Sequence, residues 1–112
     1  MILYHGTSLE NKEKILNYGF KTTYGEYGEC IYLAVDKDLA YDYGDEIIEV
    51  FVDDEYIVEI DILKIDTNIG RSDLGKFAYK NDYKAIQVNY SDIRSSKNYS
   101  EICIYDTSII EI

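Results

Sequence analysis

The sequence GECIYLAVDKDLAYDYG at residues 28–44 carries the strongest structural signal of this chain. It opens with apolar, β-favouring residues at positions 30–34, which predict a buried strand after a glycine-rich loop. Val35 and Asp36 predict a turn, with Asp36 as the N-cap of a short helix. Gly44 is expected to end that helix in the left-handed conformation. The stretch is therefore predicted to be a strand, a turn and a helix.

Two tyrosines of this stretch face each other in the expected geometry. Tyr32 comes from the strand, and Tyr43 follows eleven positions later on the helix. Leu39 and Ala40 lie three or four residues before Tyr43 and share its helix face. The strand–turn–helix can bring the two rings to opposite walls of a slot that suits a flat aromatic guest. The alternative is that both are core residues in a chain with 13 tyrosines.

A second pattern, LYHGTS at residues 3–8, contains the single histidine of the chain. His5 is expected at the end of a strand, where an imidazole can donate to a sugar hydroxyl. Gly6 lacks a side chain, so a planar carboxamide can lie against its backbone N–H and C=O. Thr7 adds a hydroxyl. The alternative is a loop histidine without a function.

A third pattern, NYSEICIYD, occupies residues 98–106. Strand alternation places Ile102 and Ile104 on one face, and Glu101, Cys103 and Tyr105 on the other. Glu101 is expected where a polar loop, residues 91–100, meets this strand, and catalytic side chains are often held at such junctions. The alternative is a solvated carboxylate, one of 22 acidic residues.

The three patterns, in this order, resemble the H-Y-E class of ADP-ribosyltransferases, the poly-ADP-ribose-polymerase-like and diphtheria-toxin-like branch. The family motifs are L-[WY]-H-G-T-S, then G-x-G-I-Y-[FL]-A with a second tyrosine eleven positions later, then N-E-Y-[IV]-[VI]-Y-D. Cys30 replaces the second glycine of G-x-G, and residues 45–83 add no motif. The resemblance therefore spans nearly the whole chain, from its first segment to its last.

The resemblance implies a single catalytic domain, residues 1–112, that uses NAD as a substrate and needs no metal. The implied fold is α+β, with two packed, mainly antiparallel sheets forming a split β-sandwich and a few short helices. Glu101 would be catalytic, with His5 and Tyr32. The implied NAD-binding residues are His5, Gly6, Thr7, Tyr32, Ala34 and Tyr43.

The acceptor is less constrained. Arginine-specific relatives carry a second glutamate two positions before the catalytic one, but this chain has Tyr99 there, on the expected acceptor loop. The resemblance favours mono-ADP-ribosylation of a macromolecule, foremost a protein, as in toxins, host-manipulating effectors or phage proteins that act on host defence. The alternatives are a nucleic-acid acceptor and an inactive NAD-binding or protein-interaction module. RNA 2′-phosphotransfer is disfavoured, because Arg71 and Arg94 are the only arginines.

Composition adds constraints on partners and location. The formal net charge of −11 disfavours nucleic acid, although it serves solubility equally well. Cys30 and Cys103 form neither a disulfide framework nor a zinc motif. The sequence has no apolar run as long as a membrane span and no basic leader, so we expect a cytoplasmic protein without a membrane partner. For a toxin or effector, the cytoplasm would be that of a host cell.

Periodicity and turn residues predict the structure of the remaining segments. Thr7 and Glu10 have capping-box spacing, which predicts a helix that buries Leu9, Ile15 and Leu16 and ends at Gly19. Residues 21–29 predict a mobile polar loop, residues 53–55 an exposed turn, and residues 66–83 an irregular segment with one helical turn at 74–79. The other expected strands are residues 48–52, 58–62, 85–90, 102–105 and 108–112.

Overall fold

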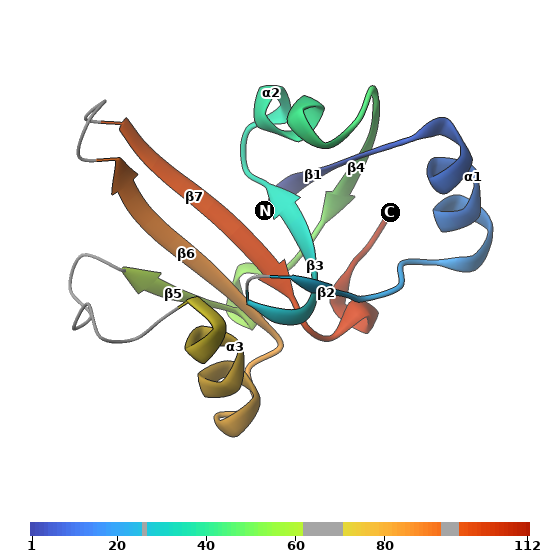
Figure 1. Ribbon diagram of the computed structural model, residues 1–112. Helices are drawn as coiled ribbons and strands as arrows, with labels where there is room; N and C mark the ends of the chain where they lie inside the picture. The colour runs from blue at the N-terminus through green and yellow to red at the C-terminus, as the bar shows by residue number, and fades with distance from the viewer. Residues whose placement is uncertain (26, 62–70, 93–96) are drawn as a thin grey trace.

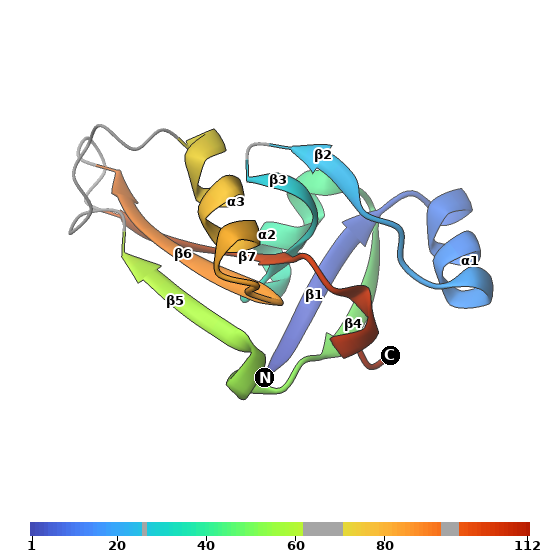
Figure 2. The same cartoon turned by 90° about the horizontal axis from the view of Figure 1, so that it is seen from below.

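The computed structural model describes residues 1–25, 27–61, 71–92 and 97–112. The fold is α+β, with a mainly antiparallel sheet and a few helices (Figures 1 and 2). The strands are β1 (Ile2–Thr7), β2 (Thr23–Gly25), β3 (Gly28–Ala34), β4 (Glu46–Phe51), β5 (Ile57–Asp61), β6 (Ala85–Asp92) and β7 (Lys97–Ile104). The α-helices are α1 (Leu9–Tyr18), α2 (Lys37–Ala40) and α3 (Arg71–Lys80), with 3₁₀ helices at Tyr41–Tyr43, Asp54–Tyr56 and Thr107–Ile109.

The strands are hydrogen-bonded in the order β4-β1-β3-β7-β6-β5, and β2 pairs with β3. β5 and β6 are parallel, and the other pairs are antiparallel. Two separate sheets were expected, but the strands form one hydrogen-bonded sheet with two halves, β4-β1 and β3-β7-β6-β5. The two halves are connected only weakly, because the register of β1 against β3 consists of the pair Tyr4–Ala34. Beyond this pair β1 and β3 diverge (Figure 1).

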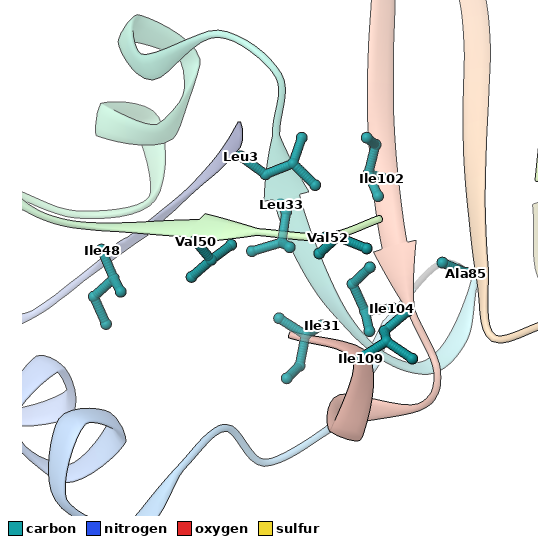
Figure 3. Packing of buried hydrophobic residues seen from close by; sticks show 10 residues of the cluster. All are labelled: Leu3, Ile31, Leu33, Ile48, Val50, Val52, Ala85, Ile102, Ile104 and Ile109. Atoms are coloured by element: carbon teal, nitrogen blue, oxygen red, sulfur yellow. The ribbon is translucent and has the colours of Figure 1, made fainter. Parts of the chain in front are cut away.

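The two halves of the sheet pack against each other through the first apolar cluster. Figure 3 shows side chains of β1, of β4 and of the residue after β4 facing those of β3 and β7. Its buried members are Leu3, Ile31, Leu33, Ile48, Val50, Val52, Ala85, Ile102, Ile104 and Ile109. Burying each isoleucine side chain contributes about 1.5–3 kcal/mol, so this cluster is the main core of the domain.

A second apolar cluster lies on the opposite face of β3, β7 and β6, under α3. Leu74 and Ala78 of α3 pack there with Cys30 and Cys103 of the sheet. Ile102 and Cys103 therefore point to opposite faces, as strand alternation predicts. This confirms the orientation expected for the third sequence pattern.

The central stretch forms the predicted strand, turn and helix. The Asp36 side chain caps α2 by accepting a hydrogen bond from the backbone N–H of Asp38, which confirms its expected role. The expectation for Gly44 was wrong, because its φ of 163° is extended backbone. Glycine is needed there for another reason: a Cβ would collide with the backbone carbonyl of Thr7.

Helix α1 differs from its prediction in two respects. Its N-cap is Ser8, whose hydroxyl accepts from the N–H of Asn11, because Thr7 belongs to β1 and is buried. Leu9 and Leu16 are exposed, and Ile15 alone of the three expected core residues packs against the first cluster. The helix ends at Gly19 as predicted, with φ +85° and an N–H that bonds to the Ile15 carbonyl.

Four other expectations are corrected by the structure. Residues 23–25 form β2 against β3, so the expected loop at 21–29 is largely a hairpin. The expected loop at 91–100 is mostly strand, since β6 runs to Asp92 and β7 begins at Lys97, with residues 93–96 outside the described part. α3 is longer than the single turn expected. The C-terminal strand is replaced by Thr107–Ile109 and one bridge between Phe51 and Glu111.

Candidate functional site

A cavity of about 860 Å³ opens where β1 and β3 cease to pair. Its walls come from the ends of β1 and β3, from β7, and from α1 with the residues that follow it. A further wall comes from the α2 segment, which we define as α2 together with the 3₁₀ helix Tyr41–Tyr43. Ligand sites commonly occupy about 300–1,000 Å³, so this cavity has the size of a cofactor pocket. Segments that are distant in sequence meet here because the sheet is split.

Seven residues singled out from the sequence line this one cavity. They come from three separate patterns, on β1, on β3 with its following helix, and on β7. They are His5, Gly6, Thr7, Tyr32, Ala34, Tyr43 and Glu101. The eighth, Tyr99, lies in β7 opposite Tyr90, two residues before Glu101, and its side chain is outside the described part.

The backbone of Gly6 faces the cavity edge of β1. Met1 and Val52 exchange both of their backbone hydrogen bonds, 2.9 and 3.0 Å long. In an antiparallel ladder such pairs alternate with non-bonded pairs, so Gly6, opposite Ile47, is a non-bonded position of the β1–β4 register. Its N–H and C=O therefore point away from β4, toward the gap between β1 and β3. A donor and an acceptor stand side by side there.

Two glycines allow the α2 segment to pack directly on β1. A Cβ on Gly6 would collide with the carbonyl of Ala40 and lie 3.3 Å from the Cβ of Tyr43. A Cβ on Gly44 would collide with the backbone of Thr7. Gly6 was expected to admit a ligand; the structure adds that it admits the helix that carries Tyr43.

His5 bridges the gap between the diverging strands. Its Nδ1 lies 3.2 Å from the Tyr32 carbonyl oxygen, which can only accept, so Nδ1 carries a proton and donates. Burial lowers the pKa of His5 below its ordinary value, and this hydrogen bond offsets part of the shift. His5 is therefore neutral at pH 7 and its Nε2 is an acceptor. In this tautomer Nε2 carries no proton, so His5 cannot make the expected donation from that atom.

Tyr32 is held by the β2–β3 hairpin. Its hydroxyl accepts a 3.0 Å hydrogen bond from the backbone N–H of Tyr27. A Cβ on Gly25 would lie 2.6 Å from the Tyr32 Cε2, so a larger residue at position 25 would push the ring aside. Burial raises the pKa of Tyr32, and the phenol stays protonated. Tyr32 is thus a fixed wall of the cavity.

Tyr43 is the other aromatic residue of the expected slot. It lies in the 3₁₀ helix Tyr41–Tyr43 and its side chain is 63 % exposed although it lines the cavity. A ring in this state can still bury much of its surface against a ligand. Of the two tyrosines expected to form the slot, Tyr32 is thus held in place and Tyr43 faces solvent.

Glu101 lies within β7, not at the end of a loop as expected. It pairs in register with Ala34 of β3, and Ala34 pairs in turn with Tyr4 of β1. The small Ala34 side chain stands between Glu101 and β1, which keeps the space over this row open. The carboxylate is half-buried and faces the same cavity as His5.

Sequence reasoning missed the contribution of α1 and the residues after it. Asn11, Lys14 and Tyr18 line the cavity at i, i+3 and i+7, together with Phe20 and Lys21. The helical spacing of the first three was visible in the sequence. The apolar pattern of the helix points elsewhere, because Leu9 and Leu16 are exposed and do not line the cavity.

No protein-family model matches this chain, and a search of curated proteins finds no matching sequence. Over the described ranges, no three His, Cys, Asp or Glu side chains gather in the manner of metal ligands. Within the same ranges, none of the helices has the length and apolar character needed to cross a membrane.

Proposed function

We propose that this protein is an NAD-dependent mono-ADP-ribosyltransferase with an ADP-ribosyltransferase-like split-sheet fold. The observation that carries the proposal is the convergence of three separate sequence patterns on one cavity. His5, Tyr32 and Glu101, one from each pattern, stand around it. The chain has 22 acidic residues and 13 tyrosines, so residues of these types that had no common function would be expected at many separate places in the structure.

The nicotinamide ring of NAD would occupy the slot between Tyr32 and Tyr43. Stacking of a flat, electron-poor ring on an aromatic wall contributes about 0.5–1.5 kcal/mol beyond its burial. The carboxamide has an NH₂ group that donates and an oxygen that accepts, and the outward C=O and N–H of Gly6 are complementary to these two groups. This pairing would hold the carboxamide at the edge of β1.

The charged parts of NAD find matching groups elsewhere in the cavity. Lys14 and Lys21 line the α1 side and would neutralise the pyrophosphate. Lys14 pairs with Glu10 at 3.2 Å, but an exposed pair of this kind is weak and readily exchanged for phosphate. His5, neutral with an accepting Nε2, would take a hydrogen bond from a ribose hydroxyl.

The reaction breaks the glycosidic bond between the nicotinamide ribose and the ring nitrogen. The bonding electrons move to the nitrogen, nicotinamide leaves, and the ribose carbon passes through an oxocarbenium-like state. Glu101 would stabilise this developing positive charge with its carboxylate. The acceptor nucleophile then bonds to the ribose carbon and loses its proton to solvent or a nearby base. No metal takes part.

We infer that the acceptor is a protein. The net charge of −11 opposes an anionic polymer, whose phosphates bind proteins through basic residues. Tyr99, two residues before Glu101, remains the predicted acceptor contact, and a tyrosine there disfavours arginine as the modified residue. Transfer to DNA or RNA is the outcome that would revise this part of the proposal.

The test is incubation with NAD labelled in the adenylate moiety, with and without a cell lysate. We expect nicotinamide release and a labelled protein that mass spectrometry identifies. Tyr43→Ala should weaken NAD binding about two- to tenfold by calorimetry, because one stacking wall is lost. Tyr41→Ala, in the same 3₁₀ helix and also exposed but outside the cavity, is the matched control and should not. Absence of NAD binding by the wild-type protein would refute the proposal.

A further inference from the structure

A chain of two hydrogen bonds connects the end of β7 to the slot. The Tyr105 hydroxyl donates to the Tyr27 carbonyl at 2.8 Å, and the Tyr27 N–H donates to the Tyr32 hydroxyl at 3.0 Å. The two bonds lie on either side of the Tyr27 Cα. Tyr27 has no exposed surface, so its backbone has little freedom to compensate if either bond is lost.

Tyr105 is itself firmly placed. Its backbone N–H donates to the Lys84 carbonyl at 2.9 Å, and its ring contacts that of Tyr79 with a centroid separation of 5.4 Å. Burial raises the pKa of Tyr105, so its hydroxyl remains a donor over the physiological range. Tyr105 therefore has a fixed position, and its hydroxyl holds the β2–β3 hairpin. Tyr105 packs on the face of the sheet that α3 covers; Figure 2 shows α3 beside this hairpin.

The second of the two hydrogen bonds, at the Tyr32 hydroxyl, determines where the Tyr32 ring can lie. The Tyr32 hydroxyl is bonded to Tyr27, and Gly25 closes the space beside the ring. A shift of the Tyr27 backbone would therefore carry the Tyr32 hydroxyl with it and change the width of the slot. The bonds run from Tyr105 through Tyr27 to the ring.

We propose that Tyr105 is a positioning residue for the nicotinamide slot, acting through Tyr27 to fix the ring of Tyr32. The proposal rests on the function proposed above. Tyr105 does not line the cavity, so its effect on a ligand must be indirect. Loss of the Tyr105 hydroxyl should therefore weaken the binding of the nicotinamide end of NAD. It should leave the binding of the ADP-ribose end, on the α1 side, unchanged.

The test compares the binding of nicotinamide alone with that of ADP-ribose alone by calorimetry. Tyr105→Phe should weaken nicotinamide about threefold to tenfold, the range expected for one neutral hydrogen bond, and leave ADP-ribose unchanged. The matched control is Tyr79→Phe. It removes a similar bond, from the Tyr79 hydroxyl to the Glu29 carbonyl at 3.2 Å on the same hairpin, and should leave both ligands unchanged.

A double-mutant cycle with Tyr32→Phe tests the route. Tyr32→Phe removes the hydroxyl at the far end, so the effect of Tyr105→Phe on nicotinamide should largely vanish in that background. An undiminished effect there, equal losses for nicotinamide and ADP-ribose, or no effect of Tyr105→Phe in a wild-type protein that binds both ligands would each overturn the inference. A wild-type protein that binds neither ligand would instead refute the proposed function itself.

Discussion

At the scale of single residues, His5 is the cavity group that responds to mild acid. It is the only histidine of the chain, and no other side-chain type has its ordinary pKa between pH 5 and 7. Its neutral form is favoured in the fold because burial disfavours the charged ring. The bond to the Tyr32 carbonyl keeps Nδ1 protonated in that form.

This predicts a pH dependence of stability with a defined sign. The pKa of His5 is lowered on folding, so below about pH 6.5 the unfolded chain binds more protons than the native one. Its contribution is complete above the unfolded pKa and is lost as pH falls through the folded pKa. The free energy of unfolding, measured with urea, should therefore fall more between pH 7 and pH 5 for the wild type than for His5→Gln. Identical slopes would show that His5 is not desolvated.

The sequence could predict which residues form the candidate site and to which face of a strand they point. It could not predict the protonation state or the tautomer of these residues. The alternation that sets Glu101 and Cys103 apart from Ile102 follows from the two-residue period of a strand. The tautomer of His5 depends on the Tyr32 carbonyl, 27 positions away, which reaches it only because β1 and β3 diverge. Such long-range contacts have no local signal in the sequence.

At the scale of elements, the packing of the α2 segment on β1 depends on two glycines. Gly6 and Gly44 both allow backbone contacts that a Cβ would block. The contact at Gly6 is against the Ala40 carbonyl, which belongs to the backbone and has little freedom to move. The position of Tyr43, which follows Ala40 by three residues, therefore depends on Gly6.

Gly6→Ala should displace α2 and the helix Tyr41–Tyr43. We expect a loss of unfolding free energy of about 1–3 kcal/mol, as for overpacked cores, together with a loss of NAD binding. Ile104→Val, in the first cluster and outside the cavity, is the control; it should cost about 0.5–1.5 kcal/mol with unchanged binding. Chemical denaturation and calorimetry separate the two effects. Retained NAD affinity in Gly6→Ala would contradict this account of the slot.

The elements themselves were predicted where local patterns decide them. The strand β3, the Asp36 cap and the Gly19 stop follow from neighbouring residues. The split between β1 and β3 was not predictable in the same way, because strand pairing joins residues 30 positions apart, such as Tyr4 and Ala34. The exposure of Leu9 and Leu16 was not predictable from their apolar character either, because neither lines the cavity, whereas Ile15 of the same helix does.

At the scale of the whole molecule, a strongly acidic chain has a cavity with two lysines and two carboxylates in different places. Lys14 and Lys21 lie on the α1 side, whereas Glu101 is on β7 and Asp42 is in the 3₁₀ helix Tyr41–Tyr43. Such a separation suits a substrate with an anionic pyrophosphate and a cationic nicotinamide ribose. The rest of the acidic surface would repel nucleic acid and remain available to a protein acceptor.

The most direct measurement is the rate of nicotinamide release from NAD by Glu101→Gln. This change keeps the size of the side chain and removes its charge, so NAD affinity and folding should be nearly unchanged. The rate should fall about a hundredfold or more, as for the loss of one preorganised electrostatic group. Glu55→Gln, in the exposed 3₁₀ helix Asp54–Tyr56, should release nicotinamide at the wild-type rate. Release by Glu101→Gln at that same rate would contradict the assignment of Glu101 and, with it, the proposed enzyme.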